Sequence, residues 1–504
     1  MYFHGLTASL ANLVAASVYS LLAIRFFLKY LSFEEYGLLS LLAQVTAYIS
    51  LLDLGLSVAF GRILVDYKNG TKQHYANGLK TASLIFHSLG FIGFLVAGII
   101  ALIGDSVLSI PPHLKNEFLI LMMAQGATLF AAFSLKPISA PLIAAGKIYV
   151  VYWINVVLIL LNSAILWFAL SGGIGIYSSV IAQGIQLVFT ALLLWRFSKP
   201  YRNTGEIRGV FNRSIVKEVF SFARDSMLWQ IGGQTLASLP IILASIWFAL
   251  GGAADLSGGM KLVLLFLAVT TRFGDMSVTP LAIQFSNGNE DNAAKQMTRI
   301  AGVSGGIGVC AAIFIVCVNP SFISWWMLGK VTWTWDANVS CAIWVAVVSV
   351  GQCIYGYAVI SRQMQLIRWA MLSECLLYLL LAYSLRDLAG LACLVWAKPV
   401  AYLIMVSVVG RKIKKHTLFD TARLVPVLLR QAAALAVTIP VCIWTSEWLT
   451  ATISQPFLAV VSGGFLACLI VLTVTPVVFT QEMRSDLLRL AKSAFFKFSK
   501  KNSV

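Results

Sequence analysis

Seven charged residues lie inside stretches of sequence that are otherwise apolar enough to cross a membrane. They are Arg25, Asp53, Lys136, Arg272, Asp275, Glu374 and Lys398. A charge inside a bilayer is costly, so such residues usually face a water-filled cavity or a partner and carry function. Cations outnumber carboxylates here, which favours an anionic ligand such as a diphosphate, since arginine binds it through a planar fork and lysine as a point charge. The carboxylates are instead candidates for coupling to H⁺ or Na⁺.

Several of these residues also have a plainer interpretation. Arg272 and Asp275 stand one helical turn apart and could neutralise each other as a structural ion pair. Lys398 has no acidic neighbour and precedes Pro399, which can kink its helix, so a cavity-facing role is favoured for it.

The remaining four lie nearer to the ends of their spans. Lys136 and Arg25 could simply extend toward the membrane surface with their long side chains. Asp53 could pair with Arg25, with Lys136 or with nothing. Glu374 lies about two turns inside its span, and interfacial pairing with an arginine such as Arg368 is the plainer interpretation.

The elements that must position these charges are membrane-spanning helices. Hydrophobic residues make up 59% of the 504 residues and charged residues only 11%, against about 25% in soluble domains. Apolar runs of about 20 residues recur along the chain and predict an all-α polytopic membrane protein. The fourteen predicted spans are 6–28, 36–62, 81–103, 118–143, 151–170, 176–195, 225–249, 259–283, 300–319, 339–360, 369–385, 388–409, 427–446 and 457–479.

The net charge of +17 comes from basic residues that follow the predicted membrane topology, so it gives no reason to expect nucleic acid as a partner. Lysine and arginine gather in the loops on one side of the predicted membrane and are sparse on the other. The positive-inside rule therefore predicts that both termini are cytoplasmic. The predicted organisation is a six-helix lobe at 1–196, a basic linker at 197–224, a second six-helix lobe at 225–410, two additional helices at 411–480 and a basic tail at 481–504.

Motifs for enzymatic chemistry are missing from the sequence. There is no GxxxxGK[ST] phosphate loop, and the five histidines are scattered, which offers neither a metal cluster nor a catalytic triad. The eight cysteines fall in apolar spans without a CxxC pair and are interpreted as small core residues. We therefore expect a transporter without a catalytic site, a metal or an organic cofactor.

The first hairpin carries a family resemblance. The pattern RFFLKYLSFEEYGLLSLL at residues 25–42, then LLDLGLSVAFGR at residues 51–62 and a polar basic loop, resembles the opening of bacterial polysaccharide-export flippases. This family belongs to the multidrug/oligosaccharidyl-lipid/polysaccharide (MOP) superfamily. Its members translocate undecaprenyl-diphosphate-linked oligosaccharide repeat units, such as O-antigen units of lipopolysaccharide.

The resemblance implies a bacterial inner-membrane protein with two lobes around a central cationic cavity and alternating access driven by an ion or proton gradient. It implies that Arg25, Arg272 and Lys398, with Lys136 behind them, bind the diphosphate or acidic sugars. The resemblance also implies that the protein acts in the lipid bilayer, with a polysaccharide polymerase and chain-length machinery as partners. The alternatives are a cation-coupled multidrug exporter of the same superfamily and a membrane glycan polymerase or ligase, against which the short outer loops argue.

Overall fold

The computed structural model describes residues 2–53, 55–68, 71–202, 208–286, 288–361, 363–416 and 421–485. This part of the chain contains α-helices and short 3-10 turns and no strand. Twelve of its helical stretches are long and apolar enough to cross a membrane, and one of these, Gln365–Ile413, covers two consecutive helices. The chain is therefore a multi-pass membrane protein, and the predicted all-α polytopic fold is confirmed.

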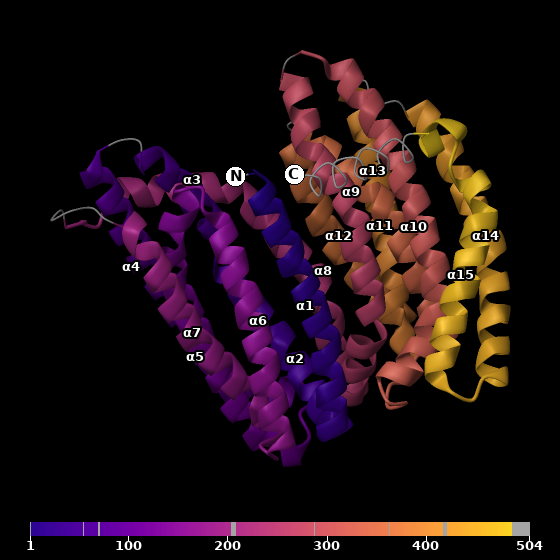
Figure 1. Ribbon diagram of the computed structural model, residues 1–504, viewed down its shortest axis with the longest axis horizontal. Helices are drawn as coiled ribbons and strands as arrows, with labels where there is room; N and C mark the ends of the chain where they lie inside the picture. The colour runs from indigo at the N-terminus through magenta and orange to yellow at the C-terminus, as the bar shows by residue number, and fades with distance from the viewer. Residues whose placement is uncertain are drawn as a thin grey trace, which may run out of the picture. The chain divides into compact units, whose positions relative to one another are not determined.

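Contacts divide the chain into two compact units, 1–258 and 259–504 (Figure 1). The first unit contains α1 (Tyr2–Tyr30), α2 (Phe33–Ile49), α3 (Leu56–Lys68), α4 (Lys72–Val107), α5 (Lys115–Ala144), α6 (Ile148–Ser171), α7 (Ser178–Ser198) and α8 (Arg213–Gly259). The second contains α9 (Lys261–Ser286), α10 (Glu290–Trp326), α11 (Trp335–Ile360), α12 (Met364–Ala389), α13 (Cys393–His416), α14 (Thr421–Thr452) and α15 (Pro456–Val478).

The division by contacts falls later in the chain than the predicted linker. It assigns α8 to the first unit, whereas the charge pattern places the linker at 197–224 and begins the second lobe at residue 225. The boundaries derived from the basic loops remain a prediction about topology.

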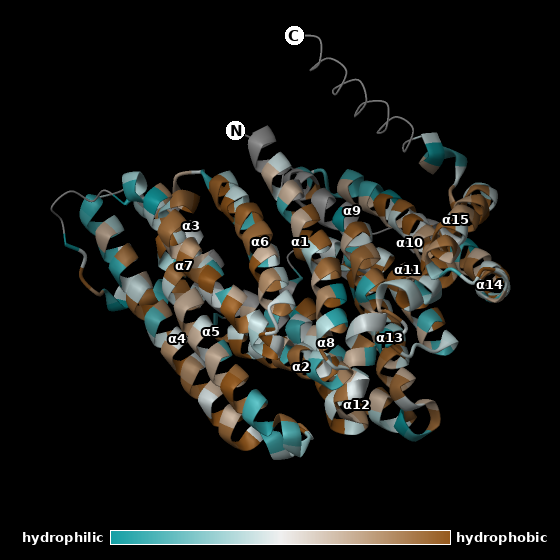
Figure 2. Cartoon of the chain, turned by 60° about the horizontal axis from the view of Figure 1, so that its bottom comes forward, coloured by the Kyte–Doolittle hydropathy of each residue, from teal (hydrophilic) through white to brown (hydrophobic). Residues whose placement is uncertain are grey.

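Apolar side chains run along the membrane-spanning helices on their outer faces as well as their inner faces. Figure 2 shows hydrophobic residues along the length of helices such as α6 and α15, with hydrophilic residues gathered near helix ends. Fully solvated helices would show apolar residues on one stripe only, whereas helices in lipid can be apolar all round. This distribution is what a bilayer environment requires.

Helix packing differs between the two units. In the first, α4 packs along α5, α1 along α6, and α7 against both α5 and α6. In the second, α10 is central and contacts α9, α11, α14 and α15. Glycines on α10 allow this close packing, because an added Cβ would clash with Ser349 of α11 at Gly308 and with Gln431 of α14 at Gly305. Small residues that allow close approach are the usual basis of helix packing in membranes.

The second predicted span, 36–62, is not one helix, and this prediction was wrong. It begins as α2 with a capping box in which Ser32 and Glu35 satisfy each other's backbone N–H groups. The helix then tightens into the 3-10 turn Ser50–Asp53, passes Gly55 with φ of +76°, and resumes as α3. Hydropathy did not reveal this break, because the residues on both sides of it are equally apolar.

Candidate functional site

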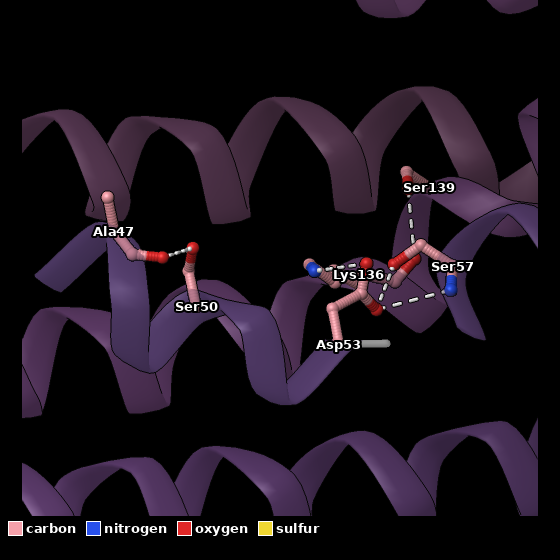
Figure 3. A network of polar contacts seen from close by, with 6 residues as sticks. All are labelled: Ala47, Ser50, Asp53, Ser57, Lys136 and Ser139. Carbon is pink, nitrogen blue, oxygen red and sulfur yellow. Dashed lines mark hydrogen bonds and ion pairs between the residues drawn. The ribbon is translucent and has the colours of Figure 1, made fainter. Parts of the chain in front are cut away.

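The break between α2 and α3 places Asp53 against α5. One carboxylate oxygen, Oδ2, lies 3.2 Å from Lys136 Nζ, and the other, Oδ1, accepts hydrogen bonds from the backbone N–H and the hydroxyl of Ser57 at 3.2 and 2.8 Å. Figure 3 shows these side chains converging where α3 begins. Asp53 therefore joins the start of α3 to the middle of α5. Of the partners considered from the sequence, the structure shows Lys136.

A cavity of about 320 Å³ adjoins this ion pair. It is lined by polar groups from Asp53, Ser57, Lys136 and Ser139 and by aromatic and aliphatic side chains from α3, α4 and α5. Lys136 Nζ also lies 4.4 Å from the centre of the Phe133 ring, within the range of a cation–π contact. The ammonium group is thus held by a carboxylate and an aromatic face together.

This arrangement decides what Lys136 can do in the conformation described. Its charge is compensated by Asp53, so the pair presents almost no net charge to a ligand. Lys136 would present its full charge to an anion in a conformation that separates it from Asp53. We call this ion pair the latch, because it links the 3-10 turn before α3 to α5. Extension of Lys136 toward the membrane surface stays a prediction.

The second unit buries a carboxylate between three helices. Glu374 of α12 is 4% exposed, and its Oε2 accepts a hydrogen bond from the Tyr355 hydroxyl of α11 at 3.3 Å. The Tyr355 ring in turn packs edge-on against the ring of Tyr402 on α13, with centroids 5.8 Å apart. The side chain of Glu374 thus packs between α11, α12 and α13, where the Tyr355 hydroxyl is a hydrogen-bond partner, and its pairing at the membrane interface stays a prediction.

Lys398 of α13 is buried on its own. It is 7% exposed, and its Nζ lies 4.6 Å from the centre of the Trp344 ring on α11. Among the residues that the structure describes, no carboxylate lies within ion-pair distance of it. An aromatic face offsets only part of the cost of burying an ammonium group. Lys398 is therefore a cation with unused capacity to bind an anion.

The other predicted site residues are less informative. Arg25 is half-buried in α1, and Arg272 is exposed on α9. The side chain of Asp275 lies outside the described residues, so the predicted Arg272–Asp275 pair does too. The structure thus brings together Asp53 with Lys136 in the first unit, and places Glu374 and Lys398 on neighbouring helices of the second.

Sequence reasoning missed the uncharged partners of these groups. Ser57 was detectable, because it follows Asp53 by one helical turn. Tyr355 and Trp344 were not, since aromatic residues are frequent in this chain and nothing in their spacing relates them to Glu374 or Lys398. Within the described ranges, no group of three histidine, cysteine or acidic side chains could hold a metal ion.

Comparisons with known proteins identify the fold. No protein-family model matches the sequence, and no curated protein matches it significantly. Among solved structures, the lipid II flippase MurJ in an inward closed conformation matches with a TM-score of 0.69 and 12% identity, covering 93% of this chain and 98% of MurJ. An inward-facing multidrug resistance MATE transporter of the MOP superfamily matches with a TM-score of 0.68 and 14% identity, covering 80% of this chain and 96% of its own. The Vibrio cholerae MATE transporter VcmN has a TM-score of 0.56 at 14% identity, covering 83% of this chain and 97% of its own. The chain therefore shares the fold of MurJ and of these MATE transporters.

Proposed function

We propose that this protein is a secondary flippase for undecaprenyl-diphosphate-linked oligosaccharide repeat units. It moves O-antigen or related surface-polysaccharide units from the cytoplasmic to the periplasmic leaflet of a bacterial inner membrane. Both termini are cytoplasmic, and transport proceeds by alternating access coupled to a proton or ion gradient. The protein performs no bond-making chemistry of its own.

The observation that carries this proposal is the buried Lys398. Removing an ammonium group from water costs several kcal/mol even after the protein relaxes, and a chain keeps such a group where an anion compensates it. Since no described carboxylate pairs with Lys398, we assign it an anionic ligand as its partner. In the export of surface polysaccharide, the anion that must cross the membrane is a lipid-linked diphosphate.

The remaining charges have supporting roles. Arg25 in the first unit and Arg272 in the second are further candidates for contact with the diphosphate. Lys136 joins them when it separates from Asp53, which makes the first-unit latch sensitive to an arriving anion. The buried carboxyl group of Glu374, held by Tyr355, is the group best placed to couple transport to H⁺ or Na⁺.

The comparisons support a lipid-linked substrate. MurJ is described as a lipid II flippase, and it accounts for 93% of this chain, whereas the MATE transporters account for 80–83%. The match to MurJ extends over almost the whole chain and so reaches the two additional helices predicted at 411–480. The first hairpin supports the same assignment from the sequence.

Complementation tests the proposal. In a host deleted for its own O-unit flippase, wild type is expected to restore surface glycan and to clear accumulated lipid-linked units, whereas Lys398→Ala and Arg272→Ala at equal membrane abundance are not. If well-expressed wild type fails in several glycan backgrounds, the flippase assignment is wrong. If wild type succeeds and both variants succeed equally, the flippase stands and the cationic site is wrong.

A cation-coupled multidrug exporter is the second candidate, and the buried Glu374 favours it. A buried carboxylate suits a cationic drug or a coupling ion, and the MATE transporters share the fold. This candidate predicts drug resistance that depends on Glu374 and is indifferent to Lys398. Measuring resistance for Glu374→Gln and Lys398→Met in a drug-sensitive host separates the two functions.

A further inference from the structure

Residues 208–212, which we name the strap, run without regular structure along the beginning of α4. Three α4 side chains at successive turns hold the strap backbone. Gln73 Nε2 donates to Arg208 O at 3.4 Å, Asn77 Oδ1 accepts from Val210 N–H at 2.8 Å, and Thr81 Oγ1 accepts from Asn212 N–H at 3.1 Å. A loop bound at each turn of a helix has a fixed position, so its outward side chains form a defined surface.

Two further contacts show how closely the strap is fitted. Gly209 lies so near the carbonyl of Ala76 that an added Cβ would clash with it. At the end of the strap, the Asn212 side chain accepts the Ser214 N–H at 2.8 Å and caps the first turn of α8. These contacts therefore fix the direction in which the backbone enters α8.

The outward side chains combine bulky apolar groups with cations. Val210, Phe211 and Phe220 are 63%, 50% and 43% exposed. Arg208, Arg213 and Lys217 are exposed beside them, and no described carboxylate lies within ion-pair distance of these three. The strap surface consists of Arg208, Val210, Phe211, Arg213, Lys217 and Phe220.

Neighbouring groups indicate that the strap surface lies near the level of lipid headgroups. The Tyr75 hydroxyl, between the α4 residues that bind the strap, donates to the carbonyl of Tyr201 just beyond α7 at 3.2 Å. The last turns of α7 expose Trp195, and Lys199 Nζ lies 5.6 Å from the centre of its ring. Tryptophan and lysine together at the end of an apolar helix mark a membrane–water interface.

Among the described side chains at the beginning of α8, the acidic one, Glu218, is exposed and bonds to a residue of α3. Glu218 Oε2 accepts a hydrogen bond from the Tyr67 hydroxyl of α3 at 2.5 Å, while Ile215 and Val219 of the same helix are buried. Arg213, Lys217 and Phe220 stand at helical spacing on the opposite, exposed face. A basic face with aromatic residues at headgroup level is typical of segments that bind anionic lipid.

We propose that the strap surface binds the headgroups of anionic phospholipid, with Phe211 and Val210 inserted among the acyl chains and the three cations on the phosphates. This would fix the segment that leads into α8 to one leaflet of the bilayer. The proposal does not depend on the transported substrate, because it concerns the outer surface of the first unit.

The test replaces Phe211 by a benzophenone amino acid in the full chain, reconstituted in bilayers of equal phosphatidylglycerol and phosphatidylcholine. Photo-crosslinking is expected to favour phosphatidylglycerol. Each cation near an anionic surface contributes about fivefold in binding, so Arg208→Gln/Arg213→Gln/Lys217→Gln is expected to bring the ratio close to one. The same probe at Leu160, an exposed apolar residue within α6, is expected to show no preference.

Matched variants make the result specific. The triple variant Arg411→Gln/Lys412→Gln/Arg430→Gln removes equal charge from exposed positions of the second unit and is expected to leave the ratio unchanged. A charge-retaining Arg208→Lys/Arg213→Lys variant is expected to keep most of the preference. The proposal is overturned if Phe211 crosslinks to protein, if the two lipids react equally in wild type, if both triple variants lose the preference alike, or if excess inorganic phosphate abolishes it.

Discussion

Breaking the Asp53–Lys136 latch from either side should destabilise the protein. The oxygen–nitrogen distance of 3.2 Å corresponds to an attraction of about 5 kcal/mol at an effective dielectric constant of 20. Desolvation offsets much of this, because the two side chains are 34% and 19% exposed. Exposed pairs contribute at most about 1 kcal/mol, and breaking buried ones costs about 3–5 kcal/mol. We therefore expect Lys136→Met to lower the free energy of unfolding by about 2 kcal/mol.

A double-mutant cycle measures the pair itself. Asp53→Asn removes the charge but still accepts the hydrogen bonds from Ser57, so it isolates the ion pair. The double variant is expected to be more stable than the sum of the single effects predicts, with a coupling energy of about 1–2 kcal/mol by reversible unfolding in mixed micelles. Lys295→Met, which breaks an exposed pair with Asp291, is the control and should cost no more than about 0.5 kcal/mol. A coupling energy near zero, or a control as costly as Lys136→Met, refutes the reasoning.

Three other substitutions test the packing and hydrogen bonds around the sites. Gly37→Ala would drive a methyl group into the Leu250 carbonyl, so thermal unfolding in detergent should show a loss of about 1–3 kcal/mol, and an unchanged midpoint would contradict the close approach. Tyr355→Phe leaves the buried Glu374 without its hydroxyl donor and should cost about 1–3 kcal/mol, whereas Glu374→Leu/Tyr355→Phe should recover part of that loss. Ser32→Ala removes the cap of α2 and should cost about 1 kcal/mol, with equal stability arguing against the capping box.

The helical architecture was predictable because hydropathy alone determines where a chain can cross a bilayer. The break at Ser50–Gly55 could not be predicted in this way, since the hydropathy of an apolar segment does not distinguish a continuous helix from one with a turn. Asp53 carried the local signal, because a carboxylate followed by Ser57 can satisfy the first N–H groups of a new helix.

The sequence singled out candidate residues for the site but only partly their partners. Because a charged side chain inside a membrane is energetically costly, the sequence pointed to Lys136, Glu374 and Lys398 as candidate functional residues. Their partners depend on which helices lie side by side, and this information is not local in the sequence. Glu374 shows the difference most clearly, because its distance from the end of the span suggested the interface, whereas packing against Tyr355 buries it.

We propose that Lys398 binds the anionic part of a lipid-linked substrate, and transport by the reconstituted protein is the assay for this contact. Flipping of a fluorescent undecaprenyl-diphosphate oligosaccharide would be measured in proteoliposomes for wild type, Lys398→Met and the exposed-lysine control Lys412→Met. A charge-assisted contact contributes about 1.5–3 kcal/mol, so Lys398→Met is expected to slow flipping by about 10- to 100-fold while the control matches wild type. Equal rates for wild type and Lys398→Met, with both proteins folded, would contradict the account.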